Sequence, residues 1–290
     1  MPPKLPFVPG GEWIFHPHYQ HHSEIIDRTD RGVYMTMSVL TFQSVDRQYI
    51  ALSYVDGVTY ILNQDGTEIW VQASPKLSMG YIMDYLLSTV ASFLLHLRHR
   101  IALHASGIVI GDEAVLFVGN SGMGKSTLAA SYALRGHEVV TDDIAGIYRQ
   151  GSDYFVAPGF PFLRLWQTST SALLGVEESL PTLAPDWHKQ FLDLQGSDYH
   201  FAQDLVKLGR IYVLHSRSDK PTAQRMNYAS AISALMSFNF LSNIFKKSLY
   251  AADFHAISTL IKSVPVFELT VPDMIEQLGS LDPILMAVCP

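Results

Sequence analysis

The stretch Gly119-Asn120-Ser121-Gly122-Met123-Gly124-Lys125-Ser126 decides the fold expected for this chain of 290 residues. It fits G-x-x-x-x-G-K-[ST], the pattern of a phosphate-binding loop. In such a loop, glycines let the backbone curl until several N–H groups point at one concavity, which suits a polyphosphate. We expect Lys125 to reach the β- and γ-phosphates and the hydroxyl of Ser126 to ligate Mg²⁺.

The flanking sequence has the strand–loop–helix order that this motif requires. Residues 114–118, Ala-Val-Leu-Phe-Val, form a short apolar run, as in a buried strand. Good helix formers follow Ser126, and Gly136 lies where a helix commonly ends. The loop from Gly119 to Thr127 is therefore predicted to bind the phosphates of a nucleotide.

The composition is that of a globular protein, with 48% hydrophobic and 16% charged residues. The net charge of −7 argues against a broad nucleic-acid-binding surface. The single cysteine, Cys289, excludes an internal disulfide, which fits a reducing compartment, and we expect a cytoplasmic protein. Polar residues interrupt the apolar segment at 81–97, so it predicts a buried helix rather than a membrane span.

Two domains are predicted. Residues 1–98 contain strand-like runs within 33–71, with hairpin signals at Asp56-Gly57 and Asp65-Gly66, and form a small β-rich module that includes the apolar helix. Residues 99–290 alternate strand-like and helix-like segments around the phosphate loop, which predicts an α/β domain. The strands of this domain are expected at 101–110, 114–118, 137–141, 209–214 and 265–270, and its helices at 126–134, 229–245, 251–263 and 272–279.

A hairpin is expected to place His104 opposite the phosphate loop. A two-residue turn at 111–112 pairs His104 with Gly119, whereas a turn at 112–113 pairs it with Ser121. In both registers the imidazole lies at the mouth of the loop. His104 is therefore a candidate catalytic residue.

The strand at 137–141 ends in two carboxylates, Asp142 and Asp143. A right-handed crossover lays this strand parallel to the one that feeds the loop, or one position away, with its carboxyl end at the same crevice. A carboxylate there can hold Mg²⁺ or accept a proton from an attacking hydroxyl. Because successive strand residues point to opposite faces, one aspartate is expected to act as base and the other as a metal or supporting ligand.

Two arginines are further candidates. Arg164 is a cation among apolar neighbours, and two roles stay open for it: pairing with an aspartate, or stabilising charge on a transferring phosphoryl group. Arg210, at the start of a strand, is a weaker candidate for contact with substrate or phosphate.

Three motifs together resemble the core of HPr kinase/phosphorylase, whose fold is shared with ATP-dependent phosphoenolpyruvate carboxykinase. They are His104 in Leu-His-Ala-Ser, the phosphate loop and the pair Asp142-Asp143, all within 99–150. The resemblance implies a P-loop kinase core of this type, preceded by a small β-rich domain. It implies that the loop holds ATP and Mg²⁺ and that an aspartate activates a serine hydroxyl. We assign catalysis to Asp142, Asp143, His104, Lys125 and Arg164, and the metal to Ser126 and Asp143.

A shorter branch of that family looks closer: the HPr-kinase-like enzymes that phosphorylate a serine of lasso-peptide precursors. The prediction is thus an ATP- and Mg²⁺-dependent serine kinase acting on a peptide or small protein, with a lasso-peptide precursor as the expected acceptor. No nucleic-acid or membrane partner is expected, and a homo-oligomer is left open.

Three alternatives remain. The first is a non-catalytic nucleotide-binding module that regulates a partner. The second is a kinase/phosphorylase acting on HPr, although the acidic metal ligand that HPr kinases carry further on and their HPr-binding motif are not evident in this sequence. The third is a carboxykinase, which the short chain and the lack of a cluster of Arg, Lys and His disfavour.

Overall fold

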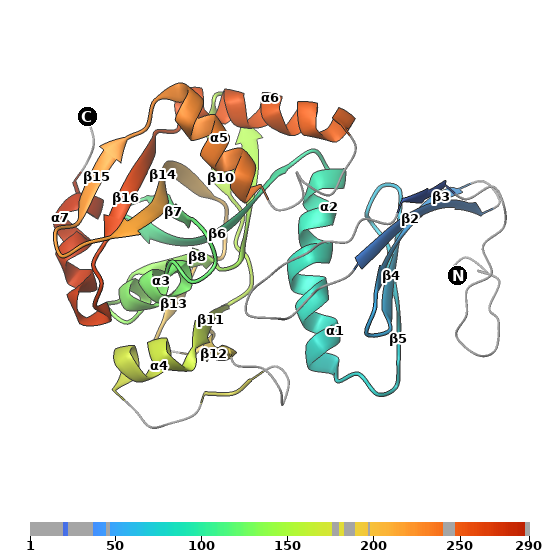
Figure 1. The fold of residues 1–290 in the computed structure, drawn as a ribbon, viewed down its shortest axis with the longest axis horizontal. Coiled ribbons are helices and arrows are strands. Elements are labelled where there is room, and N and C mark those ends of the chain that lie inside the picture. Colours follow the sequence, from blue (N-terminus) through green and yellow to red (C-terminus); the bar gives the residue numbers. More distant parts are fainter. Residues whose placement is uncertain are drawn as a thin grey trace. The chain divides into compact units, whose positions relative to one another are not determined.

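The computed structural model describes residues 20–22, 37–44, 47–175, 180–182, 189–196, 198–239 and 247–287. The predicted strand residues 33–36 and helix residues 240–245 lie outside these ranges. The chain divides into two compact units, Met1–Arg98 and His99–Pro290, each of which has its own sheet (Figure 1).

An antiparallel sheet forms most of the N-terminal unit, and each of its strands pairs with the next one in the chain. The two turns that carry the Asp-Gly signals contain Gly57 and Gly66, both at positive φ, as such hairpin turns require. The strands are β1 (Gln20–His22), β2 (Met37–Ser44), β3 (Arg47–Tyr54), β4 (Val58–Asn63) and β5 (Ile69–Ala73).

One continuous helix follows this sheet and packs against it. The hydroxyl of Tyr60, on β4, donates to the carbonyl of Ile82. Within the described ranges, this is the one helix that is long and apolar enough to cross a membrane, with a mean hydropathy of 1.2. A core helix can pass the same test, and the polar side chains of Asp84 and Ser92 are buried. Its segments are α1 (Met79–Tyr85), the π-helical η1 (Leu86–Val90) and α2 (Ala91–Leu97).

A nine-stranded mixed sheet forms the centre of the C-terminal unit. Its order is β13-β8-β6-β9-β10-β14-β16-β15, and β7 pairs with both β6 and β14. Strands β7, β14 and β16 run parallel, so their carboxyl ends lie at one edge. The strands are β6 (Ile101–Ile110), β7 (Glu113–Val118), β8 (Glu138–Thr141), β9 (Ile144–Gln150), β10 (Asp153–Val156), β13 (His200–Phe201), β14 (Val206–Arg217), β15 (Thr222–Arg225) and β16 (Val266–Val271).

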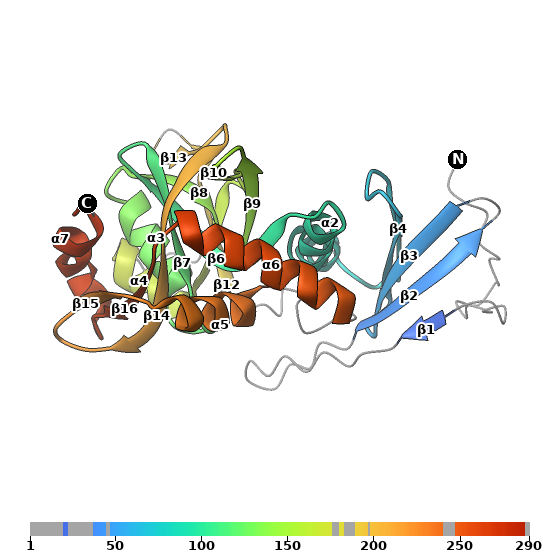
Figure 2. The same cartoon turned by 90° about the horizontal axis from the view of Figure 1, so that it is seen from above.

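Helices cover this sheet through two separate apolar cores (Figure 2). Leu235 and Leu260 belong to the core shared with α5 (Tyr228–Phe238) and α6 (Lys247–Ser263). The other core joins the sheet to a two-stranded ribbon and to further helices. These elements are α3 (Lys125–Ala133), β11 (Phe162–Trp166), α4 (Gln167–Leu174), β12 (Lys189–Asp193), the 3₁₀ segment η2 (Ile275–Leu281) and α7 (Asp282–Leu285).

The fold class is as predicted, a mixed α/β arrangement around a phosphate loop, preceded by a small β sheet. The predicted strands and helices of the C-terminal unit are present with shifted ends. The predicted closing helix at 272–279 is instead a 3₁₀ segment followed by the short helix α7. The β9–β10 hairpin, the ribbon of β11 and β12, and α4 were not predicted.

Candidate active site

The phosphate loop joins β7 to α3, in the order that the motif requires. Gly122 and Gly124 have φ of 81° and 95°, in the region that favours glycine, and Gly124 directly precedes α3. Lys125 is buried, and its Nζ donates to the carbonyl oxygens of Gly119 at 2.8 Å and Asn120 at 3.2 Å. The ammonium is therefore held inside the curl of the loop, where phosphate oxygens would bind.

The hairpin of β6 and β7 has the first of the two predicted registers. Ile110 pairs with Glu113 across the turn at 111–112, and Ala105 pairs with Val118 at the last pair. The next residue of β6, His104, therefore lies beside the start of the phosphate loop. On its other edge β6 pairs with β9, where His104 lies opposite Ile144.

A turn between β8 and β9 brings both carboxylates of the aspartate pair, Asp142 and Asp143, to the site. β8 pairs with β6 as far as Thr141, and β9 resumes the pairing at Ile144. Between them Asp143 has φ of 71°, an uncommon value for a residue other than glycine, and the N–H of Ile144 donates to the Asp142 carbonyl at 2.9 Å. The expected alternation of side chains is broken at this point, so both side chains serve one site.

Asp142 is the centre of the hydrogen bonds at the loop. Its Oδ1 accepts from the hydroxyls of Ser126 at 2.8 Å and Ser106 at 2.5 Å. Its Oδ2 accepts from the backbone N–H of Arg164 at 2.8 Å. The carboxylate adjacent to the loop serine is thus Asp142, whereas the sequence had led us to assign Asp143 to the metal with Ser126.

Asp143 forms a separate cluster with the guanidinium of Arg164 and the imidazole of His104. The guanidinium of Arg164 donates to its Oδ2 at 3.0 Å, and Nδ1 of His104 lies 3.2 Å from its Oδ1 and 3.0 Å from its carbonyl oxygen. Because both neighbours of Nδ1 are oxygen acceptors, we place the imidazole proton on that nitrogen. Burial alone would raise the pKa of Asp143, but Arg164 and His104 outweigh burial and hold the pKa well below its usual range.

Arg164 forms an ion pair with Asp143, which was one of the two roles left open for it. Of the other predicted residues, Thr127 forms a hydrogen bond between its hydroxyl and that of Ser169 on α4, at 2.9 Å. Asn120 and Ser121 are exposed at the tip of the loop. Arg210 is not at this site. It is buried, and its guanidinium donates to the carbonyl of Ala287 at 2.7 Å.

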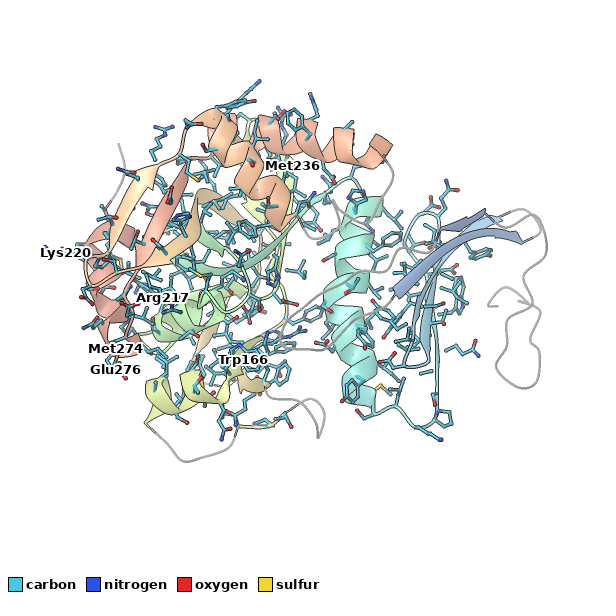
Figure 3. All side chains as sticks on the ribbon, in the orientation of Figure 1. Trp166, Arg217, Lys220, Met236, Met274 and Glu276 are labelled. Atoms are coloured by element: carbon cyan, nitrogen blue, oxygen red, sulfur yellow. The ribbon has the colours of Figure 1, made fainter. Side chains whose placement is uncertain are left out.

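A further arginine, Arg217 at the end of β14, lies beside the loop and was not predicted from the sequence (Figure 3). Its Nη2 lies 3.4 Å from the carbonyl oxygen of Gly122 and 3.5 Å from that of Met123. Its Nη1 lies 3.3 Å from the carbonyl oxygen of Pro272. The parallel pairing of β14 with β7 could have suggested this placement, because residues beyond Val213 must run past the loop.

Fold and site together define a P-loop α/β protein with an acidic pair beside the phosphate loop. Comparison with known proteins is consistent with this class: a family model described as HPr Serine kinase C-terminal domain matches residues 95–163. These residues include His104, the phosphate loop and the aspartate pair. The matches support an HPr kinase-like family for this chain.

Individual relatives also match part of this chain. HPr kinase/phosphorylase of Lactobacillus johnsonii is 35% identical over 77 residues, which is 26% of this chain and 24% of the relative. That of Chromobacterium violaceum is 36% identical over 88 residues, or 30% of this chain and 27% of the relative. The chain thus matches about a quarter of the length of these relatives.

Among solved structures, the Hpr(Ser) kinase/phosphatase from Coxiella burnetii is similar to this chain. The similarity covers 64% of this chain and 97% of that chain, at 16% identity and a TM-score of 0.34.

Proposed function

We propose that this protein is an ATP- and Mg²⁺-dependent serine kinase that transfers the γ-phosphate to a serine of a peptide or small protein. The observation that carries the proposal is that the two aspartates of the pair have different partners. Asp142 is hydrogen-bonded to the loop hydroxyl of Ser126, while Asp143 lies with Arg164 and His104. One carboxylate is therefore available for a metal, and a second for the acceptor hydroxyl.

The residues around Ser126 suit Mg²⁺. The metal prefers oxygen ligands and commonly takes only one or two protein carboxylates, with phosphate and water completing its coordination. The Ser126 hydroxyl and the Asp142 carboxylate supply such oxygens, although no cluster of three or more His, Cys, Asp or Glu side chains that could hold a metal occurs among the described residues. Bound Mg²⁺ neutralises charge on the β- and γ-phosphates.

Asp143 is the proposed base. The serine oxygen forms a bond to the γ-phosphorus, the bond from that phosphorus to the β–γ bridging oxygen breaks, ADP leaves, and the serine proton passes to Asp143. A carboxylate with a lowered pKa is a weak base, but it is fully ionised at neutral pH. Phosphoryl transfer does not require a strong base, because its transition state is loose and is stabilised mainly by positioning and by neutralisation of charge.

Two cations and the loop amides would stabilise charge on the transferring group. Lys125 lies inside the loop, where the β- and γ-phosphates are expected. Arg164 is held beside Asp143 and can exchange part of that contact for a phosphoryl oxygen. His104 orients Asp143 through its Nδ1 proton and so fixes the direction from which the acceptor hydroxyl must approach.

The acceptor is part of the proposal. We expect a lasso-peptide precursor, or otherwise another small protein, as suggested by the HPr kinase/phosphorylases that match part of this chain. The proposal places the enzyme in the cytoplasm, where ATP and Mg²⁺ are supplied. Whether it acts as a homo-oligomer can be tested by light scattering of the purified chain.

Labelled ATP provides the test. Wild-type protein, Lys125→Ala and the double variant Asp142→Asn/Asp143→Asn are incubated with γ-labelled ATP, Mg²⁺ and either a lasso-precursor peptide or HPr. We expect label on serine with the wild type and none with the variants. If the wild type binds ATP and labels neither acceptor nor other serine peptides, the protein is a nucleotide-binding module and the kinase proposal is wrong.

A further inference from the structure

We infer that the outward face of the β11–β12 ribbon binds the acceptor polypeptide and selects segments that carry an acidic side chain close to the serine. By outward face we mean Phe162, Arg164, Trp166, Lys189 and Phe191. The inference rests on the proposed kinase function and adds to it a location and a chemical preference for the acceptor.

The ribbon has one buried face and one partly exposed face, on which Arg164 is buried and the other four residues are half-buried. Leu163, Leu165 and Leu192 point into the core beneath the sheet and are 0%, 1% and 4% exposed. Side chains alternate along a strand, so the residues between them point the other way. Cross-strand pairing sets Arg164 opposite Phe191, and Trp166 opposite Lys189, on that second face.

Arg164, in the middle of the outward face, contacts both aspartates of the site. The guanidinium of Arg164 is bonded to Asp143, and the backbone N–H of Arg164 is bonded to Asp142. Both directions along the ribbon from Arg164 therefore lead away from the proposed base. A polypeptide that approaches Asp143 along the ribbon passes over one or both of them.

Aromatic rings line one direction. The rings of Phe162 and Phe191 meet edge to face at 5.1 Å between centroids. Phe160 stacks on Phe162 at 6.1 Å and is 39% exposed. Such partly exposed aromatic groups commonly anchor a bound peptide, because they bury large area at low entropic cost.

In the other direction along the ribbon from Arg164 lies a lysine, Lys189. Nζ of Lys189 lies 5.3 Å from the centroid of the Trp166 ring, and its charge contributes to lowering the pKa of Asp143. Unlike Arg164, Lys189 makes no ion pair with a described residue. The acid on this face, Asp193, lies at the far end opposite Phe162, where its carboxylate accepts from the N–H of Gln195.

This arrangement sets the spacing of the acceptor. Trp166 and Lys189 are one alternation along the ribbon from Arg164, a step of roughly 7 Å for two strand residues. An extended peptide advances by the same amount in two residues. An acidic side chain two or three positions from the serine would therefore reach Lys189. This attraction is local to the ribbon, because the net charge of the whole protein is negative.

The test uses synthetic serine peptides that are identical except for Glu, Gln or Lys at the second and third positions on either side of the serine. We compare kcat/KM for γ-phosphate transfer by the wild type, Lys189→Glu, Phe191→Ala and the control Lys207→Glu, whose lysine pairs with Asp153 on the surface. We expect the wild type and Lys207→Glu to prefer the Glu peptides about tenfold. Lys189→Glu should reverse this preference, and Phe191→Ala should raise KM for every peptide.

Affinity for a fluorescent ATP analogue serves as the folding control and should be unchanged in Lys189→Glu and Phe191→Ala. A wild type without preference, or the same preference in Lys189→Glu, overturns the inference. So does an equal fall of kcat for all peptides in Lys189→Glu, because the lysine would then act on the transferring phosphoryl group.

Binding separates this inference from the kinase proposal. Anisotropy of the same peptides, labelled with fluorescein, is measured with the wild type and Lys189→Glu in the absence of transfer. Tighter binding of Glu peptides that Lys189→Glu abolishes supports the acceptor face even if no serine is labelled. Equal binding of Glu and Lys peptides overturns it even if transfer is observed.

Discussion

The phosphate loop and the β11–β12 ribbon hold different oxygens of the same carboxylate, and they are built on different principles. The loop contacts Oδ1 of Asp142 through Ser126, and the ribbon contacts Oδ2 through the backbone of Arg164. The loop is a contiguous stretch whose shape depends on its glycines. The ribbon joins strands that are separated by more than twenty residues in the chain, and apart from this backbone contact its charged residues act through side chains.

The difference explains which parts of the site can change independently. Backbone amides of the loop can recognise a nucleotide in any protein that carries this motif. The ribbon face is made of side chains, so its specificity can be altered by substitution without loss of the fold. We therefore expect substitutions in the loop to affect the nucleotide, and substitutions in the ribbon to affect transfer and the choice of acceptor.

The largest effect is expected for Lys125→Ala. The variant loses a buried cation in the loop, and we expect affinity for ATP to fall by a factor on the order of 10², with transfer below detection. Titration with a fluorescent ATP analogue measures the first effect. The control Lys207→Ala, at an exposed ion pair with Asp153, should bind as the wild type does. Unchanged ATP affinity in Lys125→Ala would show that the loop is not the nucleotide site.

Arg164→Met tests the ribbon side. Transfer should fall about 10²-fold because a preorganised positive charge is lost, while ATP affinity stays within a few-fold of the wild type. The substitution also removes the strongest influence that lowers the pKa of Asp143, so that pKa rises and the acid limb of the pH–rate profile moves to higher pH.

Arg164→Met should also change how the stability of the fold depends on pH. Since the folded-state pKa of Asp143 lies below its unfolded value, this group stabilises the fold above the unfolded pKa, and the stabilisation is lost as pH falls through the folded pKa. In Arg164→Met this stabilisation should be smaller, and its loss should be complete at a higher pH than in the wild type. Lys207→Met is the control, because Lys207 pairs with Asp153 on the surface, away from the site. A pH profile identical to that of the wild type would contradict the role of Arg164.

Asp142→Asn should affect the metal more than the nucleotide. We expect the Mg²⁺ concentration for half-maximal transfer to rise by about 10- to 100-fold, because the amide is a poorer ligand than the carboxylate next to Ser126. Rates measured over a Mg²⁺ series at saturating ATP give this value. If Asp143→Asn shows the stronger shift in Mg²⁺ requirement, the two aspartates have the opposite roles.

The smallest effect concerns the segment that leads into the ribbon. A Cβ at Gly159 would lie 2.4 Å from Oγ1 of Thr141 and 3.3 Å from its Cα, immediately before the aspartate pair. Gly159→Ala should therefore destabilise the protein by about 1–3 kcal/mol and lower the midpoint of thermal unfolding by several degrees. The control is Gly196→Ala, where a Cβ meets no atom within 4 Å. Equal midpoints for the two variants would contradict this packing.

The sequence was sufficient for the loop, for His104 and for the arrival of two aspartates at one site, because each depends on local pattern or on hairpin register. It was insufficient for their roles, because those depend on the positive φ of Asp143, which no neighbouring glycine signalled. Arg164 was recognised as unusual, but its partner was decided by the ribbon. Lys189 was not predicted, because it reaches the site only through the pairing of β12 with β11, in which it lies opposite Trp166.

The most direct test of the central claim is single-turnover transfer by Asp143→Asn, with γ-labelled ATP, Mg²⁺ and an accepted serine peptide. We predict that the variant binds ATP as the wild type does but transfers phosphate 10²- to 10⁴-fold more slowly, a range typical of the loss of a general base. Transfer at the wild-type rate by Asp143→Asn, with ATP bound, would contradict the assignment of Asp143 as the base.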